Sequence, residues 1–542
     1  MPCDIRAASL RQVAYVITQN CCKDASCVPV CPVECIRPIG GSGTLTGTEM
    51  LYIEPNVCID CGACEEECPV GAIYSEDSLP PDQERFKEIN ARYFEANPLR
   101  PDDTDHHDFH GTVKAGSLRV AIVGAGPAGC YAADDLIRVK GVEVSMFERL
   151  PIPYGLVRFG VAPDHQHTKD ITRLFAETLD SNRLTCYFNV TVGTDITHEE
   201  LLANHHAVIY SVGASKSRTL GIPGESLPGY HAAADFVGWY NGHPDHAHRE
   251  FDLSGERAVI IGNGNVSLDI ARILLSPNET LAATDIAEHA LQALAGSSVR
   301  EVVIIARRGP RHAAFSIGEF LALGALPDVD VIIDSDEFDP EPGDDIETVI
   351  KLEIAREFAQ RPATLGNKRI VFRFLATPEE VVGDDRALGL RVTGDSEPIE
   401  ASLILCSTGY LGSAIADVPF DVGAGTVPND GGRVVDDSGE PVPGVYVTGW
   451  IKRGPRGVIG TNRSCAEQTV SRLWEDFDSG LLGSGVADVA DITGLLATRE
   501  VQPVDWRGWT AIDEAEQERG AQSGRPRLKF VDVDDMLAAL GR

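Results

Sequence analysis

The stretch LRVAIVGAGPAGCYAADDL, residues 118–136, decides the fold of this chain. It begins as an apolar strand, turns at Gly124-x-Gly126-x-x-Gly129 and continues in small residues with helical spacing. The glycines permit a tight turn that brings the free amides of a helix N-terminus to a pyrophosphate. A second strand, VEVSMFE, ends at Glu148, 19 residues after Gly129, where a carboxylate can bind ribose hydroxyls. Strand, helix and acid together favour a dinucleotide site over a chance glycine-rich turn.

A second unit of the same kind follows in ERAVIIGNGNVSLDIARILL, residues 256–275. Its next strand, in REVVIIARRG, ends in Arg307 and Arg308 where the first unit has an acid. Guanidinium groups match a 2′-phosphate, so this unit is predicted to bind NADP rather than NAD, with a surface ion-pair cluster as the alternative. The second strand of the first unit ends in an acid, and that of the second unit ends in two arginines. Together the two units imply FAD and NADPH on facing domains, which is an arrangement for hydride transfer.

Cysteines cluster upstream of these units, with ten of the 14 before residue 70. Such clustering indicates metal binding rather than disulfides. A segment ending in CPVECI, at 31–36, recurs 37 residues later and ends in CPVGAI, at 68–73. The second copy carries C-x2-C-x2-C-x3-C-P, the bacterial ferredoxin pattern, in which the fourth cysteine crosses to the other cluster. Zinc ribbons, the alternative, need neither this triple spacing nor the trailing Cys-Pro.

The crossing rule assigns two ligand sets. The predicted ligands of a 4Fe-4S cluster are Cys31, Cys58, Cys61 and Cys64. The predicted ligands of the other cluster are Cys21, Cys27 and Cys68, with Asp24 at the fourth position. Iron in a cluster prefers thiolate to a hard oxygen, so the second cluster is either 3Fe-4S or a 4Fe-4S cluster ligated by Asp24. Cys22 and Cys35 align with non-ligating residues of the other copy and are expected to be packing residues.

The charge balance excludes some function classes. With 47 basic and 82 acidic residues the formal net charge is −35, which disfavours binding to nucleic acid or to an anionic membrane surface. Solubility explains this charge, and an acidic face for a basic redox partner is the alternative. No apolar run reaches the roughly 18 residues that span a bilayer, and the first residues lack a signal-peptide core, so the chain is predicted to be cytoplasmic.

Two further segments carry no derived chemistry. Residues 75–117 are acidic and dotted with prolines, which predicts a connector with one short helix near residues 83–96. Its histidines are interpreted as part of a solvated linker rather than a metal site; they are His106, His107 and His110. The stretch 508–530 is expected to be an exposed, charged helix and loop.

Four sequence segments are more specific than these general patterns. They are YGLVRFGVAPDH at 154–165, NGNVSLDIAR, ARRGPRHAAF, and GWIKRGPRGVIGTN at 449–462. They resemble the adrenodoxin reductase type of ferredoxin-NADP reductase. With the cysteine repeat in front, the chain resembles the bacterial fused ferredoxin/ferredoxin-NADP reductases.

This resemblance implies an α/β fold with two Rossmann-like nucleotide-binding domains, of which the FAD domain is discontinuous and the NADP domain is inserted, behind a small α+β ferredoxin domain of bacterial type. The expected divisions are a ferredoxin domain at 1–75, a linker at 76–117, an FAD segment at 118–225, an NADP domain at 226–435, and a second FAD segment with a C-terminal extension at 436–542.

The glycine-rich turns and the resemblance together assign cofactor-binding residues. The FAD set is Gly124, Ala125, Gly126, Pro127, Ala128, Gly129, Glu148, Leu156, Val192, Trp450, Gly457, Val458 and Ile459. The NADP set is Arg218, Gly262, Asn263, Gly264, Asn265, Val266, Arg307, Arg308, Glu319 and Gly457. Trp450 either faces the flavin, as the resemblance implies, or packs.

Two residues are candidates for the catalytic centre. Glu319 either meets the nicotinamide carboxamide or caps a helix, and His165 either relays protons near the flavin or is structural. The implied reaction is hydride transfer between NADPH and FAD, with single-electron transfer to or from the clusters and an acceptor such as a ferredoxin or a haem monooxygenase. The alternatives are the small subunit of glutamate synthase, whose cluster region lacks the tandem repeat, and a non-catalytic ferredoxin-like module on a degraded reductase.

Overall fold

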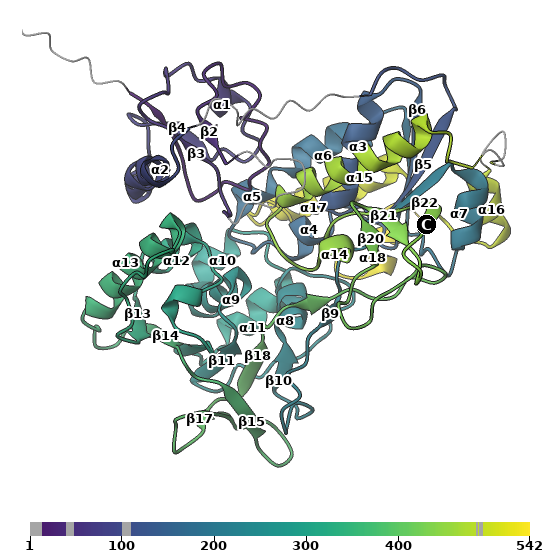
Figure 1. Cartoon of the computed structure of the whole chain (residues 1–542). Coiled ribbons are helices and arrows are strands. Elements are labelled where there is room, and N and C mark those ends of the chain that lie inside the picture. Colours follow the sequence, from purple (N-terminus) through teal and green to yellow (C-terminus); the bar gives the residue numbers. More distant parts are fainter. Residues whose placement is uncertain (1–12, 39–47, 100–109, 484–485, 487–490, 542) are drawn as a thin grey trace, which may run out of the picture.

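The computed structural model describes residues 13–38, 48–99, 110–483, 486 and 491–541. Three parts lie side by side in Figure 1: a small purple part at the upper left, a sheet-based part at the upper right, and a second sheet-based part, teal and green, below. Within the described ranges, no helix has the length and apolar character needed to cross a bilayer.

The small part is built on two antiparallel strand pairs, β1 with β4 and β2 with β3. Its elements are β1 (Tyr15–Ile17), β2 (Ile36–Arg37), β3 (Tyr52–Ile53), α1 (Ala63–Glu66), β4 (Ile73–Ser75), a short 3-10 helix (Pro81–Gln83) and α2 (Arg85–Ala96). Strands this short cannot form a stable sheet alone, so the loops between them must be held by other contacts.

The upper right part contains a seven-stranded sheet in the order β20-β21-β22-β8-β5-β6-β7, parallel from β22 to β7. Its strands are β5 (Leu118–Val123), β6 (Val142–Glu148), β7 (Leu184–Phe188), β8 (Ala207–Tyr210), β20 (Asn429–Asp430), β21 (Arg433–Val435) and β22 (Pro441–Val447). Every residue of β5 is buried, as its unbroken apolar run predicts for a strand covered on both faces. The chain returns to this sheet at β20, before the predicted boundary at residue 436.

Helices surround this sheet in the upper right part of Figure 1. They are α3 (Pro127–Arg138), α4 (Leu156–Phe159), α5 (Gln166–Lys169), α6 (Thr172–Leu179), α7 (His198–Asn204), α14 (Trp450–Arg453), α15 (Thr461–Asp478), α16 (Ile492–Thr498), α17 (Trp506–Ala521) and α18 (Val533–Ala538).

The lower part lies between these two segments of sequence and forms a six-stranded parallel sheet in the order β10-β18-β11-β12-β14-β13. Its strands are β10 (Tyr230–Ala232), β11 (Arg257–Ile261), β12 (Glu301–Ile305), β13 (Val329–Asp334), β14 (Lys368–Arg373) and β18 (Leu403–Cys406), with an antiparallel flap of β15 (Pro378–Val382), β16 (Gly389–Val392) and β17 (Ile399–Glu400). Its helices are α8 (Ala233–Tyr240), α9 (Asn265–Leu275), α10 (Asn278–Ala282), α11 (Glu288–Ala295), a 3-10 turn (Pro310–His312), α12 (Ile317–Leu323) and α13 (Ile346–Gln360). The two connectors, β9 (Lys216–Ser217) and β19 (Tyr410–Leu411), pair with each other.

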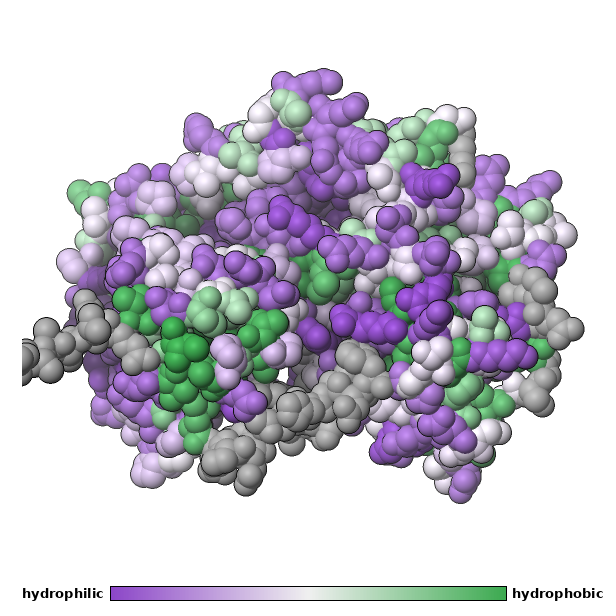
Figure 2. Space-filling view, turned by 90° about the horizontal axis from the view of Figure 1, so that it is seen from above, coloured by the Kyte–Doolittle hydropathy of each residue, from purple (hydrophilic) through white to green (hydrophobic). Residues whose placement is uncertain are grey.

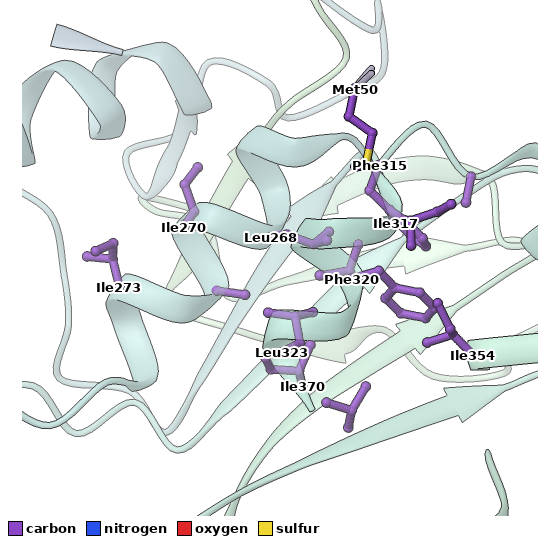
Figure 3. Packing of buried hydrophobic residues seen from close by; sticks show 14 of the residues in the cluster. Met50, Leu268, Ile270, Ile273, Phe315, Ile317, Phe320, Leu323, Ile354 and Ile370 are labelled. Atoms are coloured by element: carbon purple, nitrogen blue, oxygen red, sulfur yellow. The ribbon is translucent and has the colours of Figure 1, made fainter. Parts of the chain in front are cut away.

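The small part is not tethered loosely. Figure 2 shows the molecule from above, with apolar side chains gathered over the small part and hydrophilic ones over most of the remaining face. Below that surface, Met50 belongs to the same buried cluster as Phe315 and Ile317 of the lower part (Figure 3). The two parts therefore share a hydrophobic core, which favours a fixed arrangement over free swinging.

Part of the expected connector packs against the small part. Asn90 of α2 is buried, accepts hydrogen bonds from the amides of Ile17 and Ile53, and donates one to the Ile17 carbonyl. The helix expected near residues 83–96 is therefore present as α2, and it packs into the small part instead of lying in a connector. His106 and His107 lie outside the described residues, while the His110 ring stacks on Trp474 at 4.0 Å.

The C-terminal stretch also differs from its expectation. Glu516 of α17 is fully buried and pairs with Arg158, its two carboxylate oxygens lying 2.6 and 2.8 Å from the Arg158 guanidinium. A buried charge is tolerated only when it is paired and hydrogen-bonded, so this stretch is part of the core rather than an exposed extension.

Candidate functional site

One small cavity collects the four cysteines assigned to the first cluster. Its lining includes Cys31, Cys58, Cys61 and Cys64 together with apolar side chains. Cys35 lines the same cavity, and its Sγ lies 3.5 Å from the Sγ of Cys31. All of these are free thiols. Convergent thiols in a sulfur-rich cavity are the donor set that a cubane cluster needs, so these residues fit the implied group.

The second set of cysteines accepts backbone hydrogen bonds at sulfur. The Cys21 Sγ lies 3.5 Å from the Leu51 amide, and the Cys68 Sγ lies 3.2 Å from the Ala72 amide. Cys27 is 6% exposed. Amides directed at cysteine sulfur stabilise the negative charge of thiolate ligands, so three thiolate donors fit a cluster here as well.

Asp24, placed fourth in that set, has its carboxylate engaged elsewhere. The Tyr131 hydroxyl donates to its Oδ2 at 2.7 Å, and the Ser26 amide donates to its Oδ1 at 3.2 Å. The Arg463 guanidinium lies 3.7 Å from the same Oδ1. Tyr131 belongs to α3 and Arg463 to α15, so Asp24 joins the small part to the seven-stranded sheet.

The first glycine-rich turn joins β5 to α3. Gly124 has a φ of 104° and lies under the Ser211 carbonyl, an approach and a conformation that disfavour any side chain. Glu148, at the end of β6, accepts hydrogen bonds from the amides of Ala125 at 3.0 Å and Leu150 at 3.2 Å. Burial raises the pKa of Glu148 above its ordinary value, and these two amides act against that rise.

Other residues of the FAD set come close to this turn. The Tyr154 amide donates to the Ala125 carbonyl at 2.8 Å, so Leu156 begins α4 beside the turn. Gly449 faces Ala128 so closely that an added Cβ would stand 2.7 Å from the Ala128 Cβ, and Trp450 follows directly. Val192 lies two residues after Val190, whose amide donates to the Glu148 carbonyl at 2.9 Å. Gly457, Val458 and Ile459 precede α15.

The second turn joins β11 to α9. Asn265 opens α9, and its Oδ1 accepts a hydrogen bond from the Ser316 amide at 2.8 Å. Because β11 and β12 pair in parallel, Arg307 and Arg308 follow β12 at the same sheet edge as the turn. Both are exposed, and among the described residues neither forms an ion pair. The ion-pair cluster considered from the sequence is therefore not what surrounds these arginines. Arg218 is exposed beside the connectors, with its amide bonded to the Gly409 carbonyl at 3.1 Å.

His165 and Glu319 come together between the two sheet-based parts. The His165 Nδ1 lies 3.6 Å from the Glu319 Oε1. Arg272 of α9 connects them, since its Nη1 donates to Glu319 at 3.1 Å and its Nη2 contacts the His165 Nε2 at 2.8 Å. A guanidinium only donates, so the His165 Nε2 accepts and its proton lies on Nδ1, facing Glu319. Ser316 caps α12 through the Glu319 amide, which leaves the Glu319 carboxylate free for this network.

Sequence reasoning missed the centre of that network. Arg272 also donates to Asp269 at 2.7 Å and to Asp164 at 3.2 Å. Burial raises the pKa of Asp269 to about 6, against the attraction of Arg272. Burial also pushes the pKa of Asp164 upward, but Arg272 outweighs that effect and holds it below its ordinary value. The available signal was a charged pair at i and i+3, Asp269 and Arg272, in a helix whose remaining residues after Ser267 are apolar.

Two known protein families match parts of this chain. The pyridine nucleotide-disulphide oxidoreductase family matches residues 118–309, and the 4Fe-4S binding domain matches residues 51–74. A protein of Mycobacterium leprae named probable ferredoxin/ferredoxin–NADP reductase is 48% identical over 541 residues, which is 97% of both chains. The chain belongs to this family.

The fused reductase also resembles relatives that cover a smaller share of it. The mitochondrial NADPH:adrenodoxin oxidoreductase of Salvelinus fontinalis is 40% identical over 463 residues, covering 78% of this chain and 91% of that one. The solved structure of Mycobacterium tuberculosis FprA in complex with NADPH has a TM-score of 0.73 and 41% identity, covering 78% of this chain and 100% of that one. The predicted α/β fold and family resemblance are confirmed.

Proposed function

We propose that this fused reductase moves electrons between NADPH and two iron-sulfur clusters through FAD, within one chain and in the cytoplasm. The observation that carries the proposal is the presence of two dinucleotide turns with opposite charges at their strand ends beside a cysteine-lined cavity. When bound, NADPH supplies a hydride, FAD accepts it, and the clusters carry single electrons.

The chain's own residues bind and orient these groups. The N-terminus of α3 receives the FAD pyrophosphate, and Glu148 holds the ribose. The N-terminus of α9 receives the NADP pyrophosphate, and Arg307 with Arg308 holds the 2′-phosphate. Because these arginines have no partner among the described residues, they bind phosphate without first breaking an ion pair.

The Arg272 network fixes the orientation of His165 and Glu319 at the junction of the two sheet-based parts. Arg272 is 5% exposed, and its contact with the His165 Nε2 leaves the Nδ1 of that ring directed at Glu319. Hydride transfer needs alignment and dryness more than acid or base. We assign His165 and Glu319 to positioning the nicotinamide and to holding the proton on that Nδ1, with Arg272 as the residue that positions both.

The two cysteine sets hold different clusters in this proposal. Cys31, Cys58, Cys61 and Cys64 hold a 4Fe-4S cluster. Cys21, Cys27 and Cys68 hold a 3Fe-4S cluster, because the Asp24 carboxylate already accepts hydrogen bonds from Tyr131 and Ser26 and is a poor candidate for a fourth ligand.

The acceptor docks at the exposed edge of the first cluster site. Cys61 is exposed, and Val57 and Ile59 beside it are 38% and 54% exposed. An apolar patch next to the acidic α1 suits a basic redox protein, such as a separate ferredoxin or a haem monooxygenase with a basic face.

An anaerobic titration of the purified holoprotein with NADPH, and with NADH as control, tests this function. We expect NADPH to bleach the flavin and the cluster absorbance together, with NADH much less effective. A flavin that bleaches while both clusters stay oxidised would restrict the clusters to the reverse flow, toward NADP. No response of either chromophore would overturn the proposal.

A further inference from the structure

We infer that electrons pass between the small part and the flavin at the loop of residues 22–24, which we call the joint. The site of Cys21, Cys27 and Cys68 would then exchange electrons with FAD before the other site does. This inference rests on the proposed function. The Gly460 amide donates to the Cys22 carbonyl at 2.8 Å. Cys22 follows the assigned cluster ligand Cys21, and Gly460 follows Ile459 of the FAD set. One hydrogen bond thus joins two backbones that each lead directly to a redox group.

Gly460 shows how tight this joint is. A Cβ added to it would stand 1.8 Å from the Lys23 carbonyl oxygen and 2.4 Å from the Asp24 amide nitrogen. Its φ is −67°, a conformation that any residue adopts, so backbone strain does not require glycine here. The missing side chain instead allows direct contact between the two backbones.

Asp24 secures the loop in place. It is 3% exposed. Its carboxylate contacts the Tyr131 hydroxyl and the Arg463 guanidinium, and both belong to the part with the seven-stranded sheet. Arg463 also donates to the Asp24 carbonyl at 3.1 Å. A buried carboxylate left without these partners would be strongly destabilised, so the joint forms only when the parts are docked.

The apolar packing gives the same order of sites. Cys21 and Cys68 pack against both large buried clusters, one of which contains the core of the part with the seven-stranded sheet. Cys58 and Cys64 belong to the other cluster alone, as Cys27 does, and Cys61 of their site is exposed. The relay therefore runs from FAD to the Cys21 site, then to the Cys61 site, and then to the acceptor.

Two variants test the joint. Tyr131→Phe removes one hydroxyl and keeps the ring that packs on Phe175 at 5.0 Å, while Gly460→Ala forces the backbones apart. Tyr446→Phe is the matched control, because its hydroxyl also donates to a carboxylate, Asp476 at 2.6 Å, but makes no described contact with residues 22–24.

The first readout is hydrogen-deuterium exchange of the holoprotein over residues 22–26 and 460–463, and the second is rapid mixing with NADPH. In Tyr131→Phe we expect exchange of the loop and the time for flavin-to-cluster transfer each to rise about tenfold, as for the loss of a hydrogen bond to a charged group. In Gly460→Ala both the exchange of the loop and the transfer time should rise by more than in Tyr131→Phe. In Tyr446→Phe both should equal the parental values. Flavin reduction by NADPH should be unchanged in all three.

The order of sites has its own test. In the parent protein, samples frozen at successive times after mixing with NADPH should show the electron paramagnetic resonance signal of the Cys21 site changing before that of the other site. Parental exchange and parental cluster reduction in both joint variants, or reduction of the Cys61 site before the Cys21 site, would overturn the inference. If NADPH fails to reduce the flavin of the parent protein, the proposed function fails instead.

Discussion

The two glycine-rich turns carry the same backbone pattern but differ at their third position. In the first turn, a Cβ on Gly129 would stand 2.1 Å from the Gly124 carbonyl oxygen. In the second turn the equivalent residue is Ser267, whose side chain is fully buried. The Ser211 hydroxyl bonds the Gly124 carbonyl at 2.8 Å and fills the space under the first turn. The first obstacle to a side chain at Gly129 is therefore the turn's own Gly124 carbonyl, and the Ser211 hydroxyl, 2.7 Å from the same added Cβ, is the second.

The charges at the strand ends differ in the same way. Glu148 is half-buried, and amides of its own part already bond it. Arg307 and Arg308 are exposed, and no ion pair engages them among the described residues. The first site is preorganised and suits a resident cofactor, whereas the second is open and suits a coenzyme that exchanges at every turnover.

The largest expected effect comes from Gly129→Ala. The added Cβ meets backbone, which cannot move aside as a side chain can, so we expect about 3 kcal/mol of destabilisation and loss of bound FAD. Flavin content and the thermal midpoint measure both. Ser267→Gly is the matched control in the other turn and should keep its flavin. Full flavin occupancy in Gly129→Ala would show that the first turn tolerates a side chain as the second does.

The next effect is on coenzyme choice. In the double variant Arg307→Ala with Arg308→Ala, two charge-assisted hydrogen bonds to the 2′-phosphate are lost, so KM for NADPH should rise about a hundredfold. Steady-state rates with an artificial acceptor measure this, and KM for NADH, which lacks the phosphate, is the internal control. Equal losses with both coenzymes would mean that the arginines hold the fold rather than the phosphate.

Local patterns predicted the parts of this molecule that depend on spacing. The strand-turn-helix around Gly124 and Gly126, the family and the α/β fold followed from the sequence, because a dinucleotide turn and a cluster loop each need fixed residues a few positions apart. The residue assignments within these sites stay predictions.

Long-range contacts were beyond such patterns. Tyr131, which donates to the Asp24 carboxylate, stands 107 residues away in sequence, and Glu516 stands 358 residues from Arg158. Spacing left two possibilities open, a 3Fe-4S cluster or a 4Fe-4S cluster ligated by Asp24, and it did not predict the hydrogen bond from Tyr131 to Asp24. Nothing local distinguishes a buried, paired carboxylate from a solvated one, which is why α17 was expected to be exposed.

A smaller effect is expected from Glu148→Gln. The amide keeps one acceptor oxygen but presents an NH2 group where the carboxylate now accepts from Ala125 or Leu150, so one backbone bond is lost. We expect FAD to dissociate about tenfold more readily, measured by flavin fluorescence on dilution. Unchanged retention of FAD would mean that the backbone amides, rather than the acid, hold the cofactor.

Ser267→Ala should have the smallest effect, and it should raise the stability of the protein rather than lower it. The Ser267 hydroxyl is buried with no hydrogen-bond partner in the described structure, so it loses water on folding and gains nothing in return. Its removal should leave NADPH oxidation unchanged and raise the free energy of unfolding by up to about 1 kcal/mol, measured by thermal denaturation. A loss of stability or a higher KM for NADPH would instead show that the hydroxyl makes a bond once coenzyme is bound. The second turn would then use its third position for a contact that glycine excludes from the first.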